Sequence, residues 1–117
     1  MIEEELTLLV RTRNVLKQGW TQGVYARDAN GDVVSPIDSK ASQWCLSGAL
    51  RKAAGISLVA KNPIQESFRK AYIAIMERCH NSDIVSFNDA NGRTQEDILE
   101  FMDLVISQRE TKMENPS

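Results

Sequence analysis

The fold is decided by residues 44–54, which read WCLSGALRKAA. Apolar and small side chains fill most of these positions, so a helix formed here would be apolar around most of its circumference and would lie in the middle of a domain. Gly48 costs a helix about 1 kcal/mol relative to alanine, which indicates a neighbouring backbone or ring that leaves no room for a β-carbon. We expect the helix to begin after Asp38 or Ser39, which can cap its free amides, and to end at Ala54 before Gly55.

Three further helices are predicted around this one. Residues 2–18 place apolar side chains on one face and precede Gly19, a residue type that often ends a helix in the left-handed conformation. Residues 62–79 begin with Asn-Pro, which is typical of a helix start, and continue with apolar residues at helical spacing. Thr94 and Asp97 approximate a capping box at the start of the last helix.

The segment between the first two helices has a different pattern. Residues 24–26 suit a strand, Asn30-Gly31 is a preferred pair for a tight turn, and residues 33–34 suit a returning strand. We therefore predict a mainly α fold, with about four helices packed around a central buried helix and a short β-hairpin between helices 1 and 2. Residues 1–109 are expected to form one domain, and residues 110–117 a polar, flexible tail.

The connector at residues 83–92 contains turn residues together with Ile84, Val85 and Phe87, which are expected to point inward. This connector and the hairpin are the two polar loops of the chain. We expect functional residues to lie in them, because binding residues are often carried on loops that a rigid scaffold positions.

Composition argues against several classes of protein. The chain has 117 residues and is 42% hydrophobic, enough for one domain to bury a core without disulfides or a metal. Its 14 basic and 16 acidic side chains create no net positive field, so nucleic-acid binding is unlikely. No stretch approaches the roughly 18–20 apolar residues that cross a bilayer. The acidic start, Glu3-Glu4-Glu5, and the two widely spaced cysteines, Cys45 and Cys79, favour a cytoplasmic protein with reduced thiols.

Four short motifs carry a resemblance to a known family. They are Gly19-Trp20, Ala26-Arg27-Asp28, Trp44-Cys45 before Gly48-Ala49-Leu50, and Asn88-Asp89 before Gly92-Arg93-Thr94. In this order they resemble an uncharacterised family of small bacterial and phage proteins, catalogued as a domain of unknown function, over residues 6–105. The resemblance implies a shared fold and implies no activity. Phe87 departs from the pattern, because relatives often show tryptophan there.

Eight residues are candidates for a ligand-binding site. They are Trp20, Arg27, Asp28, Trp44, Asn88, Asp89, Arg93 and Thr94. The forked donors of Arg27 and Arg93 can hold a carboxylate or phosphate, and a tryptophan can stack on a nucleotide ring. If the loops meet, they would form a polar pocket for a small anionic ligand. The alternative is a structural Arg-Asp network that ties the loops to the core, as turn aspartates and surface ion pairs usually do.

Catalysis and metal binding have weaker support. A hydrolase would use Cys45 as nucleophile, with His80 as its base, or Asp28 and Asp89 as an acid-base pair. However, Cys45 lies in the most apolar stretch, where thiols usually behave as small hydrophobic groups. A calcium loop starting at Asp28 fails, because its glycine falls before the sixth position, where the pattern needs it, and Ser39 stands where a glutamate is needed. We expect no cofactor and no metal.

The leading functional hypothesis is therefore a non-enzymatic protein that binds a partner protein or a second copy of itself. It would serve as an accessory factor of a phage or a bacterium, for example in counter-defence. The first helix would supply contact surface through Leu8, Val10 or Val15. A binder of a small anionic ligand such as a nucleotide ranks second, and a Cys- or carboxylate-dependent hydrolase third.

Overall fold

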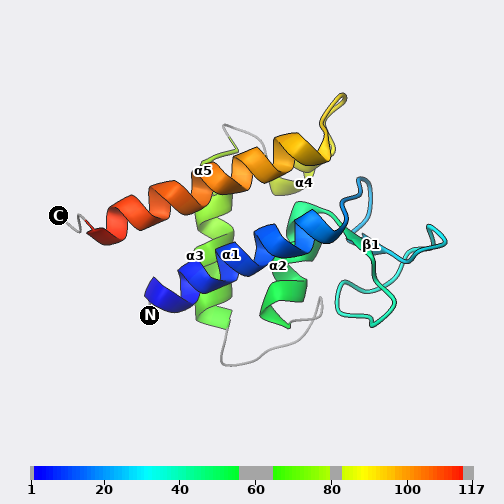
Figure 1. Cartoon of the computed structure of the whole chain (residues 1–117), viewed down its shortest axis with the longest axis horizontal. Helices are drawn as coiled ribbons and strands as arrows, with labels where there is room; N and C mark the ends of the chain where they lie inside the picture. The colour runs from blue at the N-terminus through cyan, green and yellow to red at the C-terminus, as the bar shows by residue number, and fades with distance from the viewer. Residues whose placement is uncertain (1, 56–64, 80–82, 115–117) are drawn as a thin grey trace.

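The computed structural model describes residues 2–55, 65–79 and 83–114 and confirms a mainly helical fold (Figure 1). Its helices are α1 (Ile2–Gln18), α2 (Leu46–Ala54), α3 (Gln65–Glu77), α4 (Ile84–Asn88) and α5 (Gln95–Glu114). Two short strands, β1 (Ala26–Arg27) and β2 (Gln43–Trp44), lie between α1 and α2. No helix of the described residues is both long and apolar enough to cross a membrane.

Helix α1 organises the packing. It contacts α2, α3 and α5, and Figure 1 shows it antiparallel to α5, with α3 crossing both. Leu8 and Leu9 of α1 are almost fully buried, as are all residues from Leu46 to Leu50 of α2. The predicted central helix is thus confirmed as a core element. Of the side chains expected to form a contact surface on α1, only Val10 is exposed, at 40%, because Leu8 and Val15 face the core.

The predicted start of the central helix is wrong. Helix α2 begins at Leu46 rather than after Asp38 or Ser39, and its N-cap is Cys45, whose thiol accepts a hydrogen bond from the Gly48 amide at 3.3 Å. The preceding residues are extended because they pair with β1 in the antiparallel register Ala26↔Trp44. The predicted end is confirmed, since Gly55 follows α2 with a left-handed φ of 69°.

The hairpin is confirmed, but β1 has a different partner from the one expected. Strand β1 pairs with β2, whereas the segment predicted to return as a strand makes one isolated bridge, Arg27↔Val33, and one hydrogen bond from the Val34 amide to the Ala26 carbonyl at 3.1 Å. A parallel bridge also joins Trp20 to Trp44. Four chain segments are therefore tied side by side at one end of the helices.

Two glycines allow backbones to approach closely. A β-carbon on Gly48 would overlap the carbonyl oxygen of Tyr25, which confirms the predicted lack of room in the central helix. A β-carbon on Gly19 would likewise overlap the carbonyl oxygen of Ser42. Gly19 is not among the glycines with positive φ, so the expectation of a left-handed helix end there is wrong, and close packing explains the residue instead.

The connector before α5 contains a short helix that was not predicted, α4. Its N-cap is Asp83, whose carboxylate accepts a hydrogen bond from the Ser86 amide at 2.6 Å. Ile84 is buried and the Phe87 ring packs on Phe101 with centroids 4.4 Å apart. Val85, in contrast, is 49% exposed rather than inward-facing.

The capping box of α5 is confirmed. The Thr94 amide donates to Asp97 and the Asp97 amide donates to the Thr94 hydroxyl, each at 3.1 Å. The helix runs to Glu114 and so includes residues 110–114 of the predicted tail. The Asn62-Pro63 helix start predicted for the third helix lies outside the described residues.

Candidate functional site

The buried side chain of Asn88 joins three segments of the chain. Its Oδ1 accepts hydrogen bonds from the Trp20 indole at 2.8 Å and from the Leu46 amide at 3.0 Å. Its Nδ2 donates to the Thr21 carbonyl at 3.1 Å and to the Asp89 carboxylate at 2.9 Å. With 0% exposure and all four hydrogen-bonding positions used, Asn88 fixes the loop after α1, the start of α2 and the end of α4 relative to one another.

We call this meeting of three segments around Asn88 the junction, and two neighbouring side chains add hydrogen bonds to it. Oδ1 of Asp89 also accepts a hydrogen bond from the Gly23 amide at 3.0 Å. The Gln22 amide group donates to the carbonyls of Asn88 at 3.0 Å and Ala90 at 3.2 Å. The loop after α1 and the end of α4 therefore meet in space.

Arg27 and Asp28 form hydrogen bonds with groups that are near them in the sequence. The Arg27 guanidinium donates to the Thr21 hydroxyl at 3.0 Å and to the Gly31 carbonyl at 3.1 Å. The Asp28 carboxylate accepts from the amides of Asn30 at 2.9 Å and Asp32 at 3.0 Å, which is the usual work of a turn aspartate. The Asp28 bonds hold the hairpin turn, and the Arg27 bonds tie β1 both to this turn and to the loop after α1.

The candidates around α5 are likewise engaged locally. The Arg93 side chain donates from Nε to the Phe87 carbonyl at 2.9 Å, and its guanidinium lies over the Phe87 ring at 4.1 Å. Thr94 takes part in the capping box of α5. Trp44 is buried and donates from its indole to the Pro36 carbonyl at 2.9 Å. The structure thus joins Trp20, Asn88 and Asp89 through side-chain hydrogen bonds. The side chains of the other five candidates bind other groups, although a backbone bridge also joins Trp44 to Trp20.

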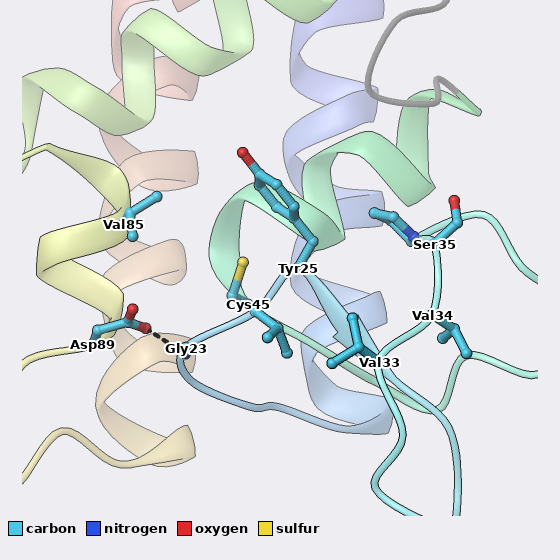
Figure 2. A pocket seen from close by; sticks show the side chains of 10 residues that line it. Gly23, Tyr25, Val33, Val34, Ser35, Cys45, Val85 and Asp89 are labelled. Carbon is cyan, nitrogen blue, oxygen red and sulfur yellow. Dashed lines mark hydrogen bonds between the residues drawn. The ribbon is translucent and has the colours of Figure 1, made fainter.

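A pocket of about 650 Å³ lies beside this junction (Figure 2). Its lining residues are mostly apolar: Gly23, Val24, Tyr25, Val33, Val34, Ser35, Pro36, Cys45, Val85 and Asp89. Figure 2 shows Val85 and Asp89 on the α4 side and Val33 and Ser35 on the opposite side, with Tyr25 and Cys45 between them. Of the eight candidate residues, only Asp89 lines this pocket.

The walls differ in exposure. Val33 and Val85 are 63% and 49% exposed, although both are apolar, and Asp89 is exposed as well. Cys45, in contrast, is 5% exposed, and burial raises the pKa of its thiol above the ordinary value of 9.0. Because the thiolate is the nucleophilic form, this raised pKa makes Cys45 poorly suited to covalent catalysis.

No group of three metal-ligating side chains occurs among the described residues. His80, the proposed base for Cys45, lies outside them. The pocket offers a mainly apolar surface together with one carboxylate, one buried thiol and the side chains of Tyr25 and Ser35.

Most of this pocket could not be predicted from the sequence. Its walls come from the loop after α1, the hairpin return, the start of α2 and α4, and their meeting depends on the Asn88 hydrogen bonds. One signal was present in the sequence, because the adjacent valines Val33 and Val34 stand in a turn-rich segment. The pattern predicts a strand at these valines, whereas both line the pocket in the structure.

Comparison with known proteins gives a family and no activity. No curated protein matches the chain, and no solved structure does. A family model described as a family of unknown function, DUF6197, matches residues 3–108 and so covers the helical body from α1 into α5. The chain therefore belongs to DUF6197, a family of unknown function.

Proposed function

We propose that this protein is a non-enzymatic binding protein whose pocket between α4 and residues 33–36 receives an apolar side chain of a partner protein. The pocket itself is the observation that carries the proposal. Its volume of about 650 Å³ lies within the range of roughly 300–1,000 Å³ that is typical of binding sites, and its lining is mainly apolar.

The pocket is formed before any partner arrives. Asn88 and Asp89 fasten α4 to the loop after α1, and the Val34 amide fastens the opposite wall to β1. A site that is already ordered pays little conformational entropy on binding. The exposed valines at its edges, Val33 and Val85, gain from being covered, as in the apolar centre of a protein interface.

Three features favour binding over catalysis. The thiol of Cys45 is buried and caps α2. Arg27 and Arg93 donate to backbone carbonyls, and neither lines the pocket, which gives little support to an anionic ligand such as a nucleotide. Asp28 does not line the pocket either, so Asp89 has no second carboxylate there to share acid-base work.

Both cysteines are free and buried, which is compatible with a reducing compartment. We place the protein in the cytoplasm of a bacterium or of a phage-infected cell as part of the same proposal. The partner is a second protein or a second copy of this chain.

The test is an affinity capture with a pocket variant. Purified wild type and the double variant Val33→Ser/Val85→Ser are immobilised and exposed to lysate of the source cells, and retained proteins are quantified by mass spectrometry. Both positions are exposed, so the substitutions leave the core intact. Val10→Ser, at an exposed valine of α1 outside the pocket, is the matched control.

The proposal predicts a protein that wild type and Val10→Ser retain and that the double variant loses. Light scattering after size-exclusion chromatography covers self-association, where wild type would be a dimer and the double variant a monomer. A wild type that is strictly monomeric and retains the same proteins as the double variant would contradict the proposal.

A further inference from the structure

We infer that Asp89 makes this pocket selective for a partner segment in which a basic residue, lysine or arginine, adjoins the inserted apolar side chain. This inference rests on the proposed function and adds the chemistry of the partner. It follows from the position and hydrogen bonding of one carboxylate.

The Asp89 carboxylate is held in a fixed orientation at the edge of the pocket. Its Oδ1 accepts from the Gly23 amide at 3.0 Å and from Asn88 Nδ2 at 2.9 Å, and Asn88 is itself fully buried. Among the described residues, no group donates a hydrogen bond to the second oxygen, Oδ2. One oxygen thus anchors the side chain, and the other remains available to a ligand.

Asp89 is also the only charged residue that lines the pocket among the described residues. No lysine or arginine of the described residues lines the pocket or forms an ion pair with Asp89. The Arg27 guanidinium approaches Gly23 but donates to Thr21, Gln22 and Gly31. A partner that covered this carboxylate without supplying a cation would bury an unpaired charge, which is strongly unfavourable. An acidic partner would be repelled.

A lysine or arginine beside the apolar side chain removes this penalty. The cation can donate to Oδ2 while the apolar group lies against Tyr25 and the valines of the two walls. Charge-assisted hydrogen bonds of this kind are shorter and stronger than neutral ones. The apolar surface supplies affinity, and Asp89 selects the partner by charge.

The test begins with a random peptide display library. The library is selected on wild type and counter-selected on Val33→Ser/Val85→Ser, so that only ligands that need the pocket remain. An enriched peptide is then synthesised with its basic residue intact and, separately, with citrulline or norleucine as the neutral replacement of arginine or lysine. Both forms are titrated by fluorescence anisotropy against wild type, Asp89→Asn and Glu100→Gln.

Asp89→Asn preserves the anchor, because the amide oxygen can still accept from Gly23 and Asn88, while the charge is lost. Glu100→Gln removes one exposed acid of α5 outside the pocket and controls for net charge. We expect enriched peptides to pair an apolar with a basic residue. Wild type and Glu100→Gln should favour the basic form about tenfold or more, and Asp89→Asn should bind both forms equally.

The outcomes separate the inference from the proposed function. Enriched peptides that depend on the pocket but lack a basic residue, or that bind wild type equally with and without it, overturn the role of Asp89 and leave the docking site standing. Absence of any peptide that prefers wild type over Val33→Ser/Val85→Ser overturns both. The comparison of the two peptide forms on wild type alone decides the role of Asp89 even where Asp89→Asn folds poorly.

Discussion

Replacing Asn88 with alanine is expected to destabilise the protein severely, although the residue lies at the end of a five-residue helix. The substitution leaves the Trp20 indole, the Leu46 amide and the Thr21 carbonyl without their partner. A buried donor or acceptor left unsatisfied costs about 1–3 kcal/mol. The Leu46 amide is buried and bears this cost fully, whereas Trp20 and Thr21 are half-buried and can recover part of it from water.

We therefore expect Asn88→Ala to lower the free energy of unfolding by roughly 3–5 kcal/mol, a large share of the roughly 5–15 kcal/mol that stabilises a typical domain. Urea denaturation followed by circular dichroism and by tryptophan fluorescence measures the loss. Asn14→Ala, at an exposed asparagine of α1, is the control and should change stability by at most about 0.5 kcal/mol.

A double-mutant cycle with Trp20→Phe isolates one bond of the junction. Because the Trp20 indole donates to Asn88, the two substitutions should couple by about 1 kcal/mol. A loss below about 1 kcal/mol in Asn88→Ala, or strictly additive effects with Trp20→Phe, would refute the view that Asn88 holds the three segments together.

Three further predictions concern packing and charge. Gly48→Ala should destabilise the protein by about 2 kcal/mol or more despite the better helix propensity of alanine, because the added β-carbon meets the Tyr25 carbonyl. Gly31 is surrounded by open space and has a φ of +85°, so Gly31→Ala should cost only about 1–2 kcal/mol of backbone strain. Thermal unfolding of the two variants compares these losses. Burial, with a smaller contribution from the charge of Asp83, raises the pKa of Cys79 from 9.0 to about 11. Because the thiol of the unfolded chain ionises at the lower pH, the stability present below pH 9 should fall by roughly 3 kcal/mol as the pH rises through 11. Cys79→Ala should flatten that part of the urea-measured stability profile, and an unchanged slope would count against the assignment. Arg109→Ala should lower the free energy of unfolding by about 3–5 kcal/mol, because it removes the ion pair of the Glu5 carboxylate, which is 2% exposed. Arg69→Ala breaks an exposed ion pair with Glu66 and should lower it by at most about 1 kcal/mol. Equal losses in urea unfolding would contradict the role assigned to burial.

Much of the helical architecture could be predicted from local patterns. The bounds of α1 follow from apolar periodicity, and the start of α5 follows from a capping box whose two side chains are three residues apart. The close approach at Gly48 was also predictable, because a glycine in so apolar a helix needs a packing reason. Each of these signals lies within one element.

The start of α2 was not predictable in the same way. Residues 43–44 are extended because they pair with residues 26–27, a contact between segments well separated along the chain. Asp38 is a more usual cap than Cys45, but its carboxylate instead accepts from the Lys40 amide at 2.7 Å in a local turn. Local propensity was overridden by pairing that only the folded chain provides.

The candidate site shows the same limit. Residue type identified Asn88 and Asp89, but it could not show that Arg27 and Arg93 find backbone carbonyls near their own loops. Nor could it show that apolar residues from four segments surround one pocket. The arginine and aspartate side chains mainly bind other groups of the protein, and only Asp89 among them lines the pocket that we propose as a docking site.

The most direct test of the docking site is a chemical-shift titration. The ¹⁵N-labelled protein is titrated with the tightest peptide from the display selection, and amide shifts are mapped on the structure. The pocket predicts the largest changes at Gly23, Val33, Val85 and Asp89, with none in Val33→Ser/Val85→Ser at the same concentration. Changes centred instead on exposed apolar residues elsewhere, such as Leu104 of α5, with these four amides unmoved, would contradict the docking site.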